Sequence, residues 1–450
     1  MEIRDPIHGL IEYDETEEKI INSSIFQRLR NIRQLALSNY VYPGAHHTRF
    51  EHSIGTMHLA GKIAPRFNLP DKKKKILRLA GLLHDIGHGP FSHVSEQILE
   101  KYVTEQELTK HKAENAHELM SICLIQKSKS LCDLLEREDT QEILNIIQKI
   151  EKRSIEKDII SGPLDVDKLD YLLRDSYFAG VKYGIFDLDK VIESLCEIKI
   201  SREASQVGIT EEGVYAIEQI LLAKYHMNIQ VYQHRVRRII DAMLIRGIEY
   251  AIEENNKNVI NCYKFKDNED FFDRYIQFDD TVIFDAILRQ PNGIAKQYFE
   301  RIKSRKLFKE VYCIEINSFN FPDIVMLENI KNISEKKLKM IEKEVARLFP
   351  TKNGGIIPEL IIADKHTISN PTFKYPQVKI NTDTIMVKKK ENLRNAFPEV
   401  STIFSNPAVD PEKDILHIYA PVDSIDDKEK RKKYIYENKD NIKNIIMEVL

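Results

Sequence analysis

The sequence predicts a mostly α-helical protein with a smaller α+β lobe at its C-terminal end, and three observations lead to this fold class. The 450 residues include only 16 glycines and 16 prolines, and such a shortage of chain breakers is typical of long helices. Apolar residues recur at helical spacing through the first part of the chain. From about residue 290 the pattern changes to short β-branched and apolar runs separated by polar turns.

The first helix is predicted from a capping box. Asp14 and Glu17 have the D-x-x-E spacing at which each side chain bonds the backbone N–H of the other residue. The apolar residues that follow recur at roughly helical spacing, so we expect this helix to continue to about Leu37. Chain breakers come next, and a second helical pattern starts near Phe50.

A further helix is predicted from Asp71, and its end is the informative part. Glycine and proline in the segment GHGP, residues 87–90, break the helix there, which places His84 and Asp85 at a helix end. Later helices are predicted from Asp165 onward and through the apolar periodicity between residues 213 and 252.

The C-terminal lobe is predicted from its strand-like runs VYCIEI, IIPELIIA, DTIMV and ILHIYAPV, with a charged helix at ISEKKLKMIEKEVARLF. We therefore divide the chain into a helical lobe over residues 1–290 and an α+β lobe over residues 291–450. The first lobe carries the residues of chemical interest, and we expect the second to serve oligomerisation or regulation.

Composition limits the classes of function. The 67 basic and 70 acidic residues almost balance, so no global field attracts nucleic acid or an acidic membrane. Five cysteines without a CxxC pair indicate neither a disulfide framework nor a zinc ribbon, and they fit a reducing compartment. No apolar run approaches the roughly 18 residues that span a bilayer, and no signal pattern opens the chain. We expect a cytoplasmic protein.

The histidines are clustered. Nine of the fourteen fall within one stretch of helical sequence, although any one of them alone is most simply a hydrogen-bonded core or surface residue. Imidazoles combined with the carboxylates of Asp85 and Asp167 make a nitrogen and oxygen ligand set suited to iron, manganese, zinc, cobalt or nickel. The nine are His46, His47, His52, His58, His84, His88, His93, His111 and His117.

The segment HDIGH at residues 84–88 has two interpretations. His84 and His88 have the spacing of a zinc-protease H-E-x-x-H helix, but such a helix must continue through the site, whereas here glycines and a proline break it. The favoured interpretation takes His84 and Asp85 as adjacent ligands at the helix end, completed by a histidine from an earlier helix and an aspartate from a later one.

Motifs in the right order give a specific resemblance. HTRFEHS at 47–53, GLLHDIGHGPFSH at 81–93 and DVDKLDYLLRD at 165–175 are accompanied by RDPIHGLIE at 4–12, FQRLRNIRQL at 26–35 and VYQHRVRRIID at 231–241. The chain resembles HD-domain deoxynucleoside triphosphate (dNTP) triphosphohydrolases, the family of the human SAM-and-HD-domain enzyme, over roughly residues 1–290. The resemblance implies an HD-domain helical core.

The resemblance also implies a metal centre. Its ligands would be the four residues His52, His84, Asp85 and Asp167, holding a divalent transition metal such as manganese, iron, zinc, cobalt or nickel, with magnesium expected on the triphosphate. Arg49 lies three residues before His52, on the same helical face, where its guanidinium would reach phosphate oxygens.

Substrate contacts follow from the same resemblance. Lys168, Tyr171 and Asp175, at i, i+3 and i+7 of one helix, share a face. They would neutralise the triphosphate, pack on the nucleoside and bond the sugar 3′-hydroxyl, respectively. Three further residues are assigned to the substrate, of which the last two would crowd the ribose 2′ carbon: Gln34, Leu35 and Tyr232.

Proton transfer needs a group that titrates near neutrality, and histidine is the natural candidate. The resemblance implies that His117 forms a catalytic pair with Glu118, that His88 contacts the α-phosphate, and that His93 protonates the leaving 5′-oxygen. His111 with Glu114 is an alternative to the first pair.

The implied reaction is hydrolysis at the α-phosphorus of a dNTP by metal-activated water, releasing deoxynucleoside and triphosphate. A second hypothesis is an HD phosphohydrolase of nucleoside monophosphates or cyclic nucleotides, against which Lys168 and Arg49 favour a polyphosphate. A third is a nucleotide-sensing or single-strand nucleic-acid-binding protein with a vestigial site and the Lys388 to Lys390 run as its surface. The complete ligand set and the absence of tryptophan argue against it.

Regulation is expected from the same family pattern. Its members are commonly oligomers, so we expect a homotetramer or homodimer with nucleotide effectors at subunit contacts. Gln27 and Arg30 match two effector residues, but Asn22 stands where effector-activated relatives have an aspartate that reads guanine. An amide cannot pair with two guanine donors as a carboxylate can, so we expect weakened guanine selectivity or constitutive activity. Alternatively, Asn22 only caps the first helix and no effector site exists.

Overall fold

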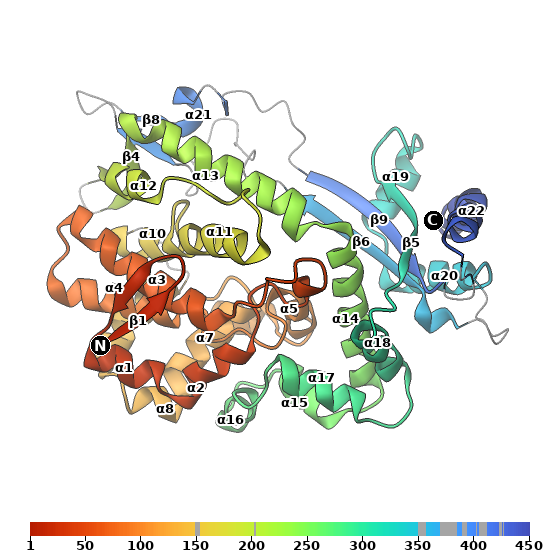
Figure 1. The fold of residues 1–450 in the computed structure, drawn as a ribbon, viewed down its shortest axis with the longest axis horizontal. Coiled ribbons are helices and arrows are strands. Elements are labelled where there is room, and N and C mark those ends of the chain that lie inside the picture. Colours follow the sequence, from red (N-terminus) through yellow and green to blue (C-terminus); the bar gives the residue numbers. More distant parts are fainter. Residues whose placement is uncertain are drawn as a thin grey trace. The chain divides into compact units, whose positions relative to one another are not determined.

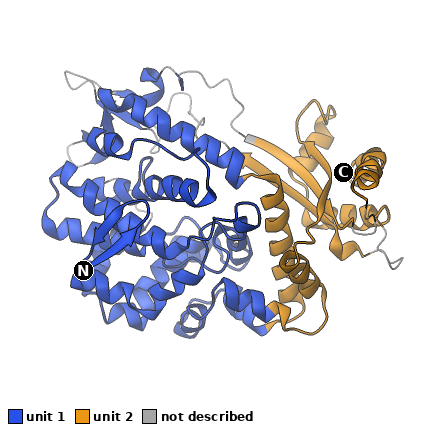
Figure 2. Cartoon of the chain, in the orientation of Figure 1, with its two compact units in different colours: residues 1–232, 257–286, 372–408 blue, residues 233–256, 287–371, 409–450 orange. Residues whose placement is uncertain are grey.

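The structure, a computed structural model, describes residues 1–148, 154–201, 204–349, 357–369, 385–388, 394–401, 403–404, 412–422, 425 and 427–450. The chain divides into two compact units, each assembled from segments that are distant in sequence (Figure 2). Unit 1 comprises Met1–Tyr232, Lys257–Ala286 and Thr372–Ala408, and unit 2 comprises Gln233–Asn256, Ile287–Pro371 and Val409–Leu450. The division into a lobe over 1–290 and a lobe over 291–450 stays a prediction.

Unit 1 is mostly helical, as the sequence predicts (Figure 1). A short antiparallel hairpin opens the chain, and the helices that follow surround the centre of the unit. The hairpin strands are β1 (Glu2–Asp5) and β2 (Gly9–Glu12), and the main helices are α1 (Glu15–Ile21), α3 (Arg49–Ile63), α4 (Asp71–Leu83), α5 (His93–Glu100), α6 (Glu105–His111), α7 (Ala116–Lys127), α9 (Arg137–Ile147), α10 (Ile155–Ser161), α11 (Val166–Ala179), α12 (Leu188–Ser194), α13 (Val214–Met227), α15 (Lys257–Tyr263) and α16 (Glu269–Tyr275).

The predicted capping box is confirmed, but the long helix after it is wrong. The Glu17 amide donates to Asp14 at 2.8 Å and the Asp14 amide donates to Glu17 at 3.0 Å. Helix α1 then ends at Ile21, because the Ser23 hydroxyl and the Gln27 amide donate to its last carbonyls, and side chains that bond the backbone compete with helix continuation. The chain goes on as the short helix α2 (Ser24–Gln27) and a 3₁₀ turn (Arg28–Asn31).

The helix ends that matter for the site are as expected. Helix α4 ends at Leu83 with His84 as its C-cap, and Asp165 caps α11 by accepting a hydrogen bond from the Lys168 amide at 2.8 Å. The periodic stretch at 213–252, in contrast, is not one helix. It comprises α13, a π-helical turn (Asn228–Tyr232) and α14 (Arg235–Glu253).

Strands also occur within residues 1–290, over which the sequence predicts a helical lobe. In unit 1, β3 (Leu195–Lys199) pairs with β4 (Ser205–Thr210), which pairs in parallel with β7 (Met386–Lys388), and β8 (Arg394–Ala396) completes the sheet. Strands β3 and β4, which lie before residue 290, were not predicted from the sequence, because the amphipathic pattern of each is short. Lys389 and Lys390 of the predicted basic run lie outside the described residues.

Unit 2 contains the antiparallel sheet that the C-terminal runs predict, with strand order β5–β9–β6. One face of β9 packs into an apolar core, where Leu416, Ile418 and Ala420 meet Ile341 and Val345 of α20. The opposite face carries polar side chains. The elements are β5 (Lys309–Glu315), β6 (Ile362–Ser369), β9 (Glu412–Ala420), α18 (Ile294–Lys303), α19 (Ile324–Lys331), α20 (Glu335–Ala346), α22 (Lys428–Glu437) and α23 (Lys439–Val449).

Among the described helices, none combines the length and the apolar character that crossing a membrane requires.

Candidate active site

Three helices of unit 1 bring the predicted metal ligands together. A capping box between Thr48 and Glu51 starts α3, so that Arg49 and His52 follow on its first two turns. His84 caps the end of α4, and Asp167 lies in the first turn of α11. Helices α3 and α11 approach closely at Gly55, where a Cβ atom would lie 1.9 Å from the Asp170 carboxylate. Glycine is therefore required at this crossing.

The four predicted ligands meet around one point. His52 Nε2 lies 3.4 Å from Asp85 Oδ2 and 3.0 Å from Asp167 Oδ1. His84 Nε2 lies 3.4 Å from Asp85 Oδ1 and 3.9 Å from Asp167 Oδ1. The ligand atoms of His52, His84 and Asp85 all lie within 4.8 Å of one another. Side chains 115 residues apart in sequence thus make one compact donor set.

The hydrogen bonds of these imidazoles fit a metal ion. His52 Nδ1 bonds Asp170 at 2.8 Å and His84 Nδ1 bonds the Gly81 carbonyl at 2.7 Å, so each ring uses Nδ1 as its donor. Both Nε2 atoms are buried and have no hydrogen-bond partner among the described residues. An imidazole fixed through one nitrogen, with the other directed at carboxylates, is typical of a metal ligand.

The charges of this donor set also fit a cation. Burial alone would raise the pKa values of Asp85 and Asp167, but both lie well below their usual range. Arg49, His84 and His88 lower the pKa of Asp85, and His52 and His84 lower that of Asp167. Burial lowers the pKa of His52, yet Asp167 and Asp170 more than offset this and raise it to about 10. The carboxylates therefore demand positive charge at this point, which a divalent ion supplies.

Asp170 was not predicted as a site residue, and its carboxylate fixes the ring of His52 through Nδ1. Its carboxylate contacts His8 at 2.7 Å, His52 at 2.8 Å and both Nε and Nη2 of Arg174 at 2.8 Å. Arg174 in turn donates to Asp5 at 2.7 Å, so the N-terminal hairpin is tied to the metal ligands. The signal was present, since Asp170 lies one turn after Asp167 within the matched motif.

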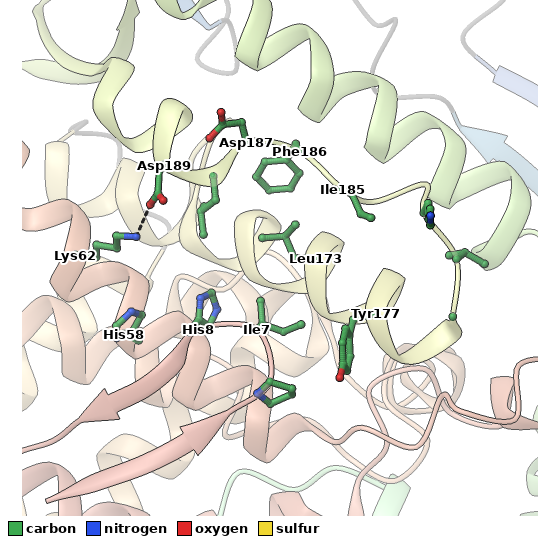
Figure 3. Close-up of a pocket in the computed structure, with 15 residues that line it drawn as sticks. Ile7, His8, His58, Lys62, Leu173, Tyr177, Ile185, Phe186, Asp187 and Asp189 are labelled. Atoms are coloured by element: carbon green, nitrogen blue, oxygen red, sulfur yellow. Dashed lines mark hydrogen bonds and ion pairs between the residues drawn. The ribbon is translucent and has the colours of Figure 1, made fainter.

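A cavity of about 660 Å³ adjoins this network (Figure 3). His8 and His58 line it, with ring centroids 5.3 Å apart, and Lys62 bonds Asp189 at 2.6 Å beside them. Burial and the neighbouring His8 lower the pKa of His58 to about 4. His58 is therefore neutral, and it lies at this cavity apart from the predicted metal ligands.

Arg49 is placed as a phosphate ligand requires. Its Nη1 bonds Asp85 at 2.5 Å and its Nε bonds the Ser92 hydroxyl at 3.0 Å. Its Nη2 is buried and has no hydrogen-bond partner in the part of the chain that the structure describes. Phe91 and Ser92 have φ angles of 63° and 50°, in the left-handed region that such residues rarely adopt. The buried carboxylate of Asp280 holds this turn by accepting from the Phe91 amide at 2.6 Å.

A second cluster contains the three predicted proton-transfer histidines. The rings of His88 and His117 stack with centroids 4.2 Å apart, and His93 meets both rings edge-on. Glu96 joins them, since it bonds His117 Nδ1 at 2.5 Å and His93 Nδ1 at 3.0 Å. His88 Nε2 lies 3.4 Å from Asp85, so the second cluster borders the metal ligands.

The predicted pairing of His117 with Glu118 is wrong. Adjacent residues on a helix point in different directions, and Glu118 turns back to accept a hydrogen bond from the Glu114 amide at 2.8 Å. Glu96 of α5 takes the place beside His117 of α7. The alternative pair of His111 with Glu114 is not formed either, because His111 bonds Asp267 at 3.1 Å. No signal in the sequence marked Glu96.

The histidines of this cluster differ in protonation. Burial and the nearby Arg49 charge hold the pKa of His88 well below its usual range, and burial lowers the pKa of His93 in spite of Glu96. Burial acts on His117 in the same direction, but its hydrogen bond to the Glu96 carboxylate reverses the effect and raises its pKa. Glu96 thus favours the protonated form of His117, whereas burial favours the neutral form of His88.

The predicted substrate residues lie on one side of α11. Asp175 bonds His47 Nε2 at 2.7 Å and accepts from the Tyr232 hydroxyl at 2.7 Å, and the rings of Tyr171 and Tyr232 are 6.4 Å apart. His47 was not assigned a role in the sequence. The ammonium of Lys168, in contrast, donates to the Gly162 carbonyl at 3.0 Å and to Asp165, which places it at the start of its own helix.

Gln34 and Leu35 follow a short bridge between Arg33 and Thr48. The Gln34 amide donates to the His47 carbonyl at 3.1 Å, and its side-chain Oε1 is buried without a hydrogen-bond partner. Leu35 is buried. An unpaired buried oxygen beside His47 suits a ligand that brings its own donor.

Of the three predicted effector residues, Gln27 and Arg30 are in contact with each other. The guanidinium of Arg30 donates to Gln27 Oε1 at 2.8 Å and lies 3.5 Å over the ring of Phe50. Asn22 is the C-cap of α1 and is exposed. Asn22 therefore caps the first helix, which is the alternative role considered for it from the sequence.

Comparison with protein families agrees with this geometry. Residues 49–175 match the HD domain and residues 186–402 match the HD associated region. The first match begins at Arg49 and contains all four proposed ligands. The fold and the site thus define an HD-domain protein, and this chain belongs to the HD-domain phosphohydrolase family.

Two relatives are similar to this chain over most of its length. The chain is 34% identical over 351 residues to the uncharacterized protein MJ1154 of Methanocaldococcus jannaschii, covering 77% of this chain and 66% of that protein. It is 28% identical over 425 residues to the deoxynucleoside triphosphate triphosphohydrolase SAMHD1 homolog of Dictyostelium discoideum, covering 88% of this chain and 75% of that protein. The matches thus span about two thirds to three quarters of these relatives.

Solved structures share the fold. A hypothetical protein from Aquifex aeolicus is similar with a TM-score of 0.68 and 28% identity, covering 98% of this chain and 100% of that one. A phosphohydrolase from Bacteroides thetaiotaomicron is similar with a TM-score of 0.70 and 24% identity, covering 93% and 99% of the two chains.

Proposed function

We propose that this protein is a metal-dependent dNTP triphosphohydrolase, which converts a dNTP and water to deoxynucleoside and triphosphate. The observation that carries the proposal is the set of four predicted metal ligands that meet around one point, beside the buried Nη2 of Arg49, which has no hydrogen-bond partner in the described part of the chain. The name of the Dictyostelium relative supports the substrate class. Hydrolysis of nucleoside monophosphates or cyclic nucleotides is the second hypothesis.

In this proposal the cation is held by His52, His84, Asp85 and Asp167. A divalent ion bound there would lower the pKa of water and neutralise phosphoryl charge. Arg49 binds the phosphate oxygens through Nη2, and Asp85 fixes the orientation of its guanidinium. Manganese, iron, zinc, cobalt and nickel all suit these nitrogen and oxygen donors.

His117 is proposed as the acid that protonates the leaving oxygen. Glu96 bonds its Nδ1, which leaves Nε2 to donate, and the same carboxylate raises the pKa of His117 and so favours the protonated ring. His88 and His93 have lowered pKa values and act as neutral hydrogen-bonding groups toward the phosphate. The predicted role of His93 as acid thus passes to His117.

Sugar selection is assigned to Asp175, Tyr232 and Leu35. Asp175 would bond the 3′-hydroxyl, while Leu35 and Tyr232 would leave a 2′-hydroxyl without space or a partner. Together these effects amount to roughly a hundredfold preference for dNTP over NTP.

A product assay tests the proposal. Purified protein with manganese is incubated with each dNTP, each NTP, dAMP and cyclic AMP, and the products are separated by ion exchange. We expect triphosphate and deoxynucleoside in equal amounts from dNTPs. Release of pyrophosphate or single phosphates, or equal kcat/KM for dATP and ATP, would contradict it.

Regulation forms the second part of the proposal. We expect a homo-oligomer, tetramer or dimer, in which a nucleotide effector acts without strict guanine choice because Asn22 replaces an acidic residue. Titrating GTP and dATP against a fixed third dNTP, in the native protein and in Asn22→Asp, measures this. Strict GTP dependence of the native protein would contradict it, and indifference to all nucleotides would show that Asn22 only caps its helix.

A further inference from the structure

The polar face of the unit 2 sheet carries a cluster of metal-ligating side chains far in sequence from the HD motifs. Cys313 of β5 lies directly opposite His417 of β9 in the antiparallel register, so both side chains project from the same face. Glu310 lies opposite Tyr419, two residues along β9 from His417, and joins the same face. Thiol, imidazole and carboxylate are thus collected at one place.

A β-bulge produces this arrangement. Glu310 and Cys313 are three residues apart, and in a regular strand such residues project from opposite faces. The register of β5 shifts between Glu310 and Tyr312, which adds one residue and turns Glu310 to the face of Cys313. Bulges commonly re-aim a side chain in this way. The Glu310 carboxylate consequently lies 2.8 Å from His417 Nδ1.

The donor atoms are close enough to share one ion. One ligand atom from each of Glu310, Cys313 and His417 lies within 4.8 Å of the other two. His366 of β6 stacks on the His417 ring with centroids 5.0 Å apart, and both of its nitrogens are buried without a hydrogen-bond partner among the described residues. The guanidinium of Arg238 lies beside this face, where it donates to the carboxylate of Asp364 at 2.9 Å.

The other clusters in the described residues are poorer candidates. Cys123 and His111 share Asp267, but Lys110 and Lys127 both donate to that carboxylate, so two ammonium charges already occupy its oxygens. The cluster around Glu96 and His117 belongs to the active site. In the sheet cluster, by contrast, three donors lie together and the carboxylate of Glu310 bonds His417 Nδ1.

We propose that Glu310, Cys313 and His417 form a second metal site, which binds a borderline divalent ion such as zinc or cobalt and ties β5 to β9. One sulfur, one nitrogen and one oxygen donor suit these ions better than magnesium or calcium. The ion would replace the proton between His417 and Glu310, and water would complete its coordination. Since the two strands are about one hundred residues apart in sequence, the ion would close a long loop and stabilise the sheet.

Cobalt(II) spectroscopy on the full reduced chain tests this site separately from the active site. A thiolate ligand gives cobalt a charge-transfer band in the near ultraviolet, whereas the histidine and aspartate ligands of the active site do not. We expect the band in the native protein and in His84→Ala, with one cobalt equivalent per chain associated with it. In Cys313→Ser we expect loss of the band and of that equivalent.

Matched variants complete the test. Cys132→Ser removes another exposed cysteine and should keep the band, whereas Glu310→Gln should keep the band but weaken cobalt binding at least tenfold. Zinc should raise the Tm of the native protein and of His84→Ala, but not that of Cys313→Ser. A band that survives in Cys313→Ser, no band in the native protein, or alkylation of Cys313 at a rate that zinc does not change would overturn the proposal.

Discussion

Two groups of histidines lie side by side in unit 1 and differ in what surrounds them. His52 and His84 direct unpaired Nε2 atoms at Asp85 and Asp167, with each Nδ1 fixed by a hydrogen bond. His88, His93 and His117 stack on one another, and Glu96 is the carboxylate that bonds two of them. We propose the same side chain as a metal ligand in one group and as a proton carrier in the other, because the surrounding carboxylates differ in number and direction.

The largest effect should follow from removing the first group. Asp167→Ala, or His84→Ala together with Asp85→Ala, should lower kcat by at least about 1000-fold, since a metal contributes several kcal/mol to phosphoryl transfer. Metal content by elemental analysis should fall with activity, while circular dichroism stays native. A folded, metal-free variant that hydrolyses dNTP at the native rate would show that the first group does not hold a catalytic metal.

Glu96→Gln should affect only the second group. Without the carboxylate the pKa of His117 falls, so kcat should drop by about 100-fold and the alkaline limb of its pH profile, where the general acid loses its proton, should move to lower pH. Metal content should not change. Glu118→Gln is the matched control, because Glu118 faces the helix start, and it should keep near-native kcat. The reverse order of effects would restore the pair that the sequence predicted.

Asp170→Asn tests how the ligands of the first group are held in place. The carboxylate fixes His52 through Nδ1, so its loss should weaken metal affinity by about tenfold. Isothermal titration with manganese measures this. Asp175→Asn, on the same helix, should instead raise KM and leave the affinity for manganese unchanged. Equal manganese affinities for the two variants would show that Asp170 does not orient the ligand.

The smallest effect concerns stability and pH. Burial raises the pKa of Asp280 to about 7, in spite of the backbone amides of Phe91 and Arg33 that bond it. The folded state therefore holds a proton that the unfolded state loses near pH 4, and the free energy of unfolding should fall as pH rises from about 4 to about 7.

Asp280→Asn should flatten this decline by an amount on the order of 2 kcal/mol between pH 5 and pH 8. Urea unfolding at both pH values measures it, with Asp279→Asn as the control at the neighbouring cap position. Identical pH slopes for native protein and Asp280→Asn would show that another group causes the decline.

The sequence by itself determined the parts of the site that depend on local pattern. Breakers at residues 87–90 end the helix and place His84 and Asp85 at its end, and the D-x-x-E pattern at Asp14 starts the first helix. Both follow from steric limits and hydrogen bonds within one turn of chain, which neighbours in sequence decide. The family and its mostly helical fold followed from the order of such motifs.

Only the tertiary structure decided which side chains meet across elements. Glu96 rather than Glu118 pairs with His117, and Asp170 reaches His8 from another element. The long helix predicted to Leu37 ends at Ile21 because side chains take its last carbonyls. Cys313 meets His417 because strand pairing and a single bulge set their register. Spacing along the chain describes one element at a time, whereas these contacts depend on how separate elements pack.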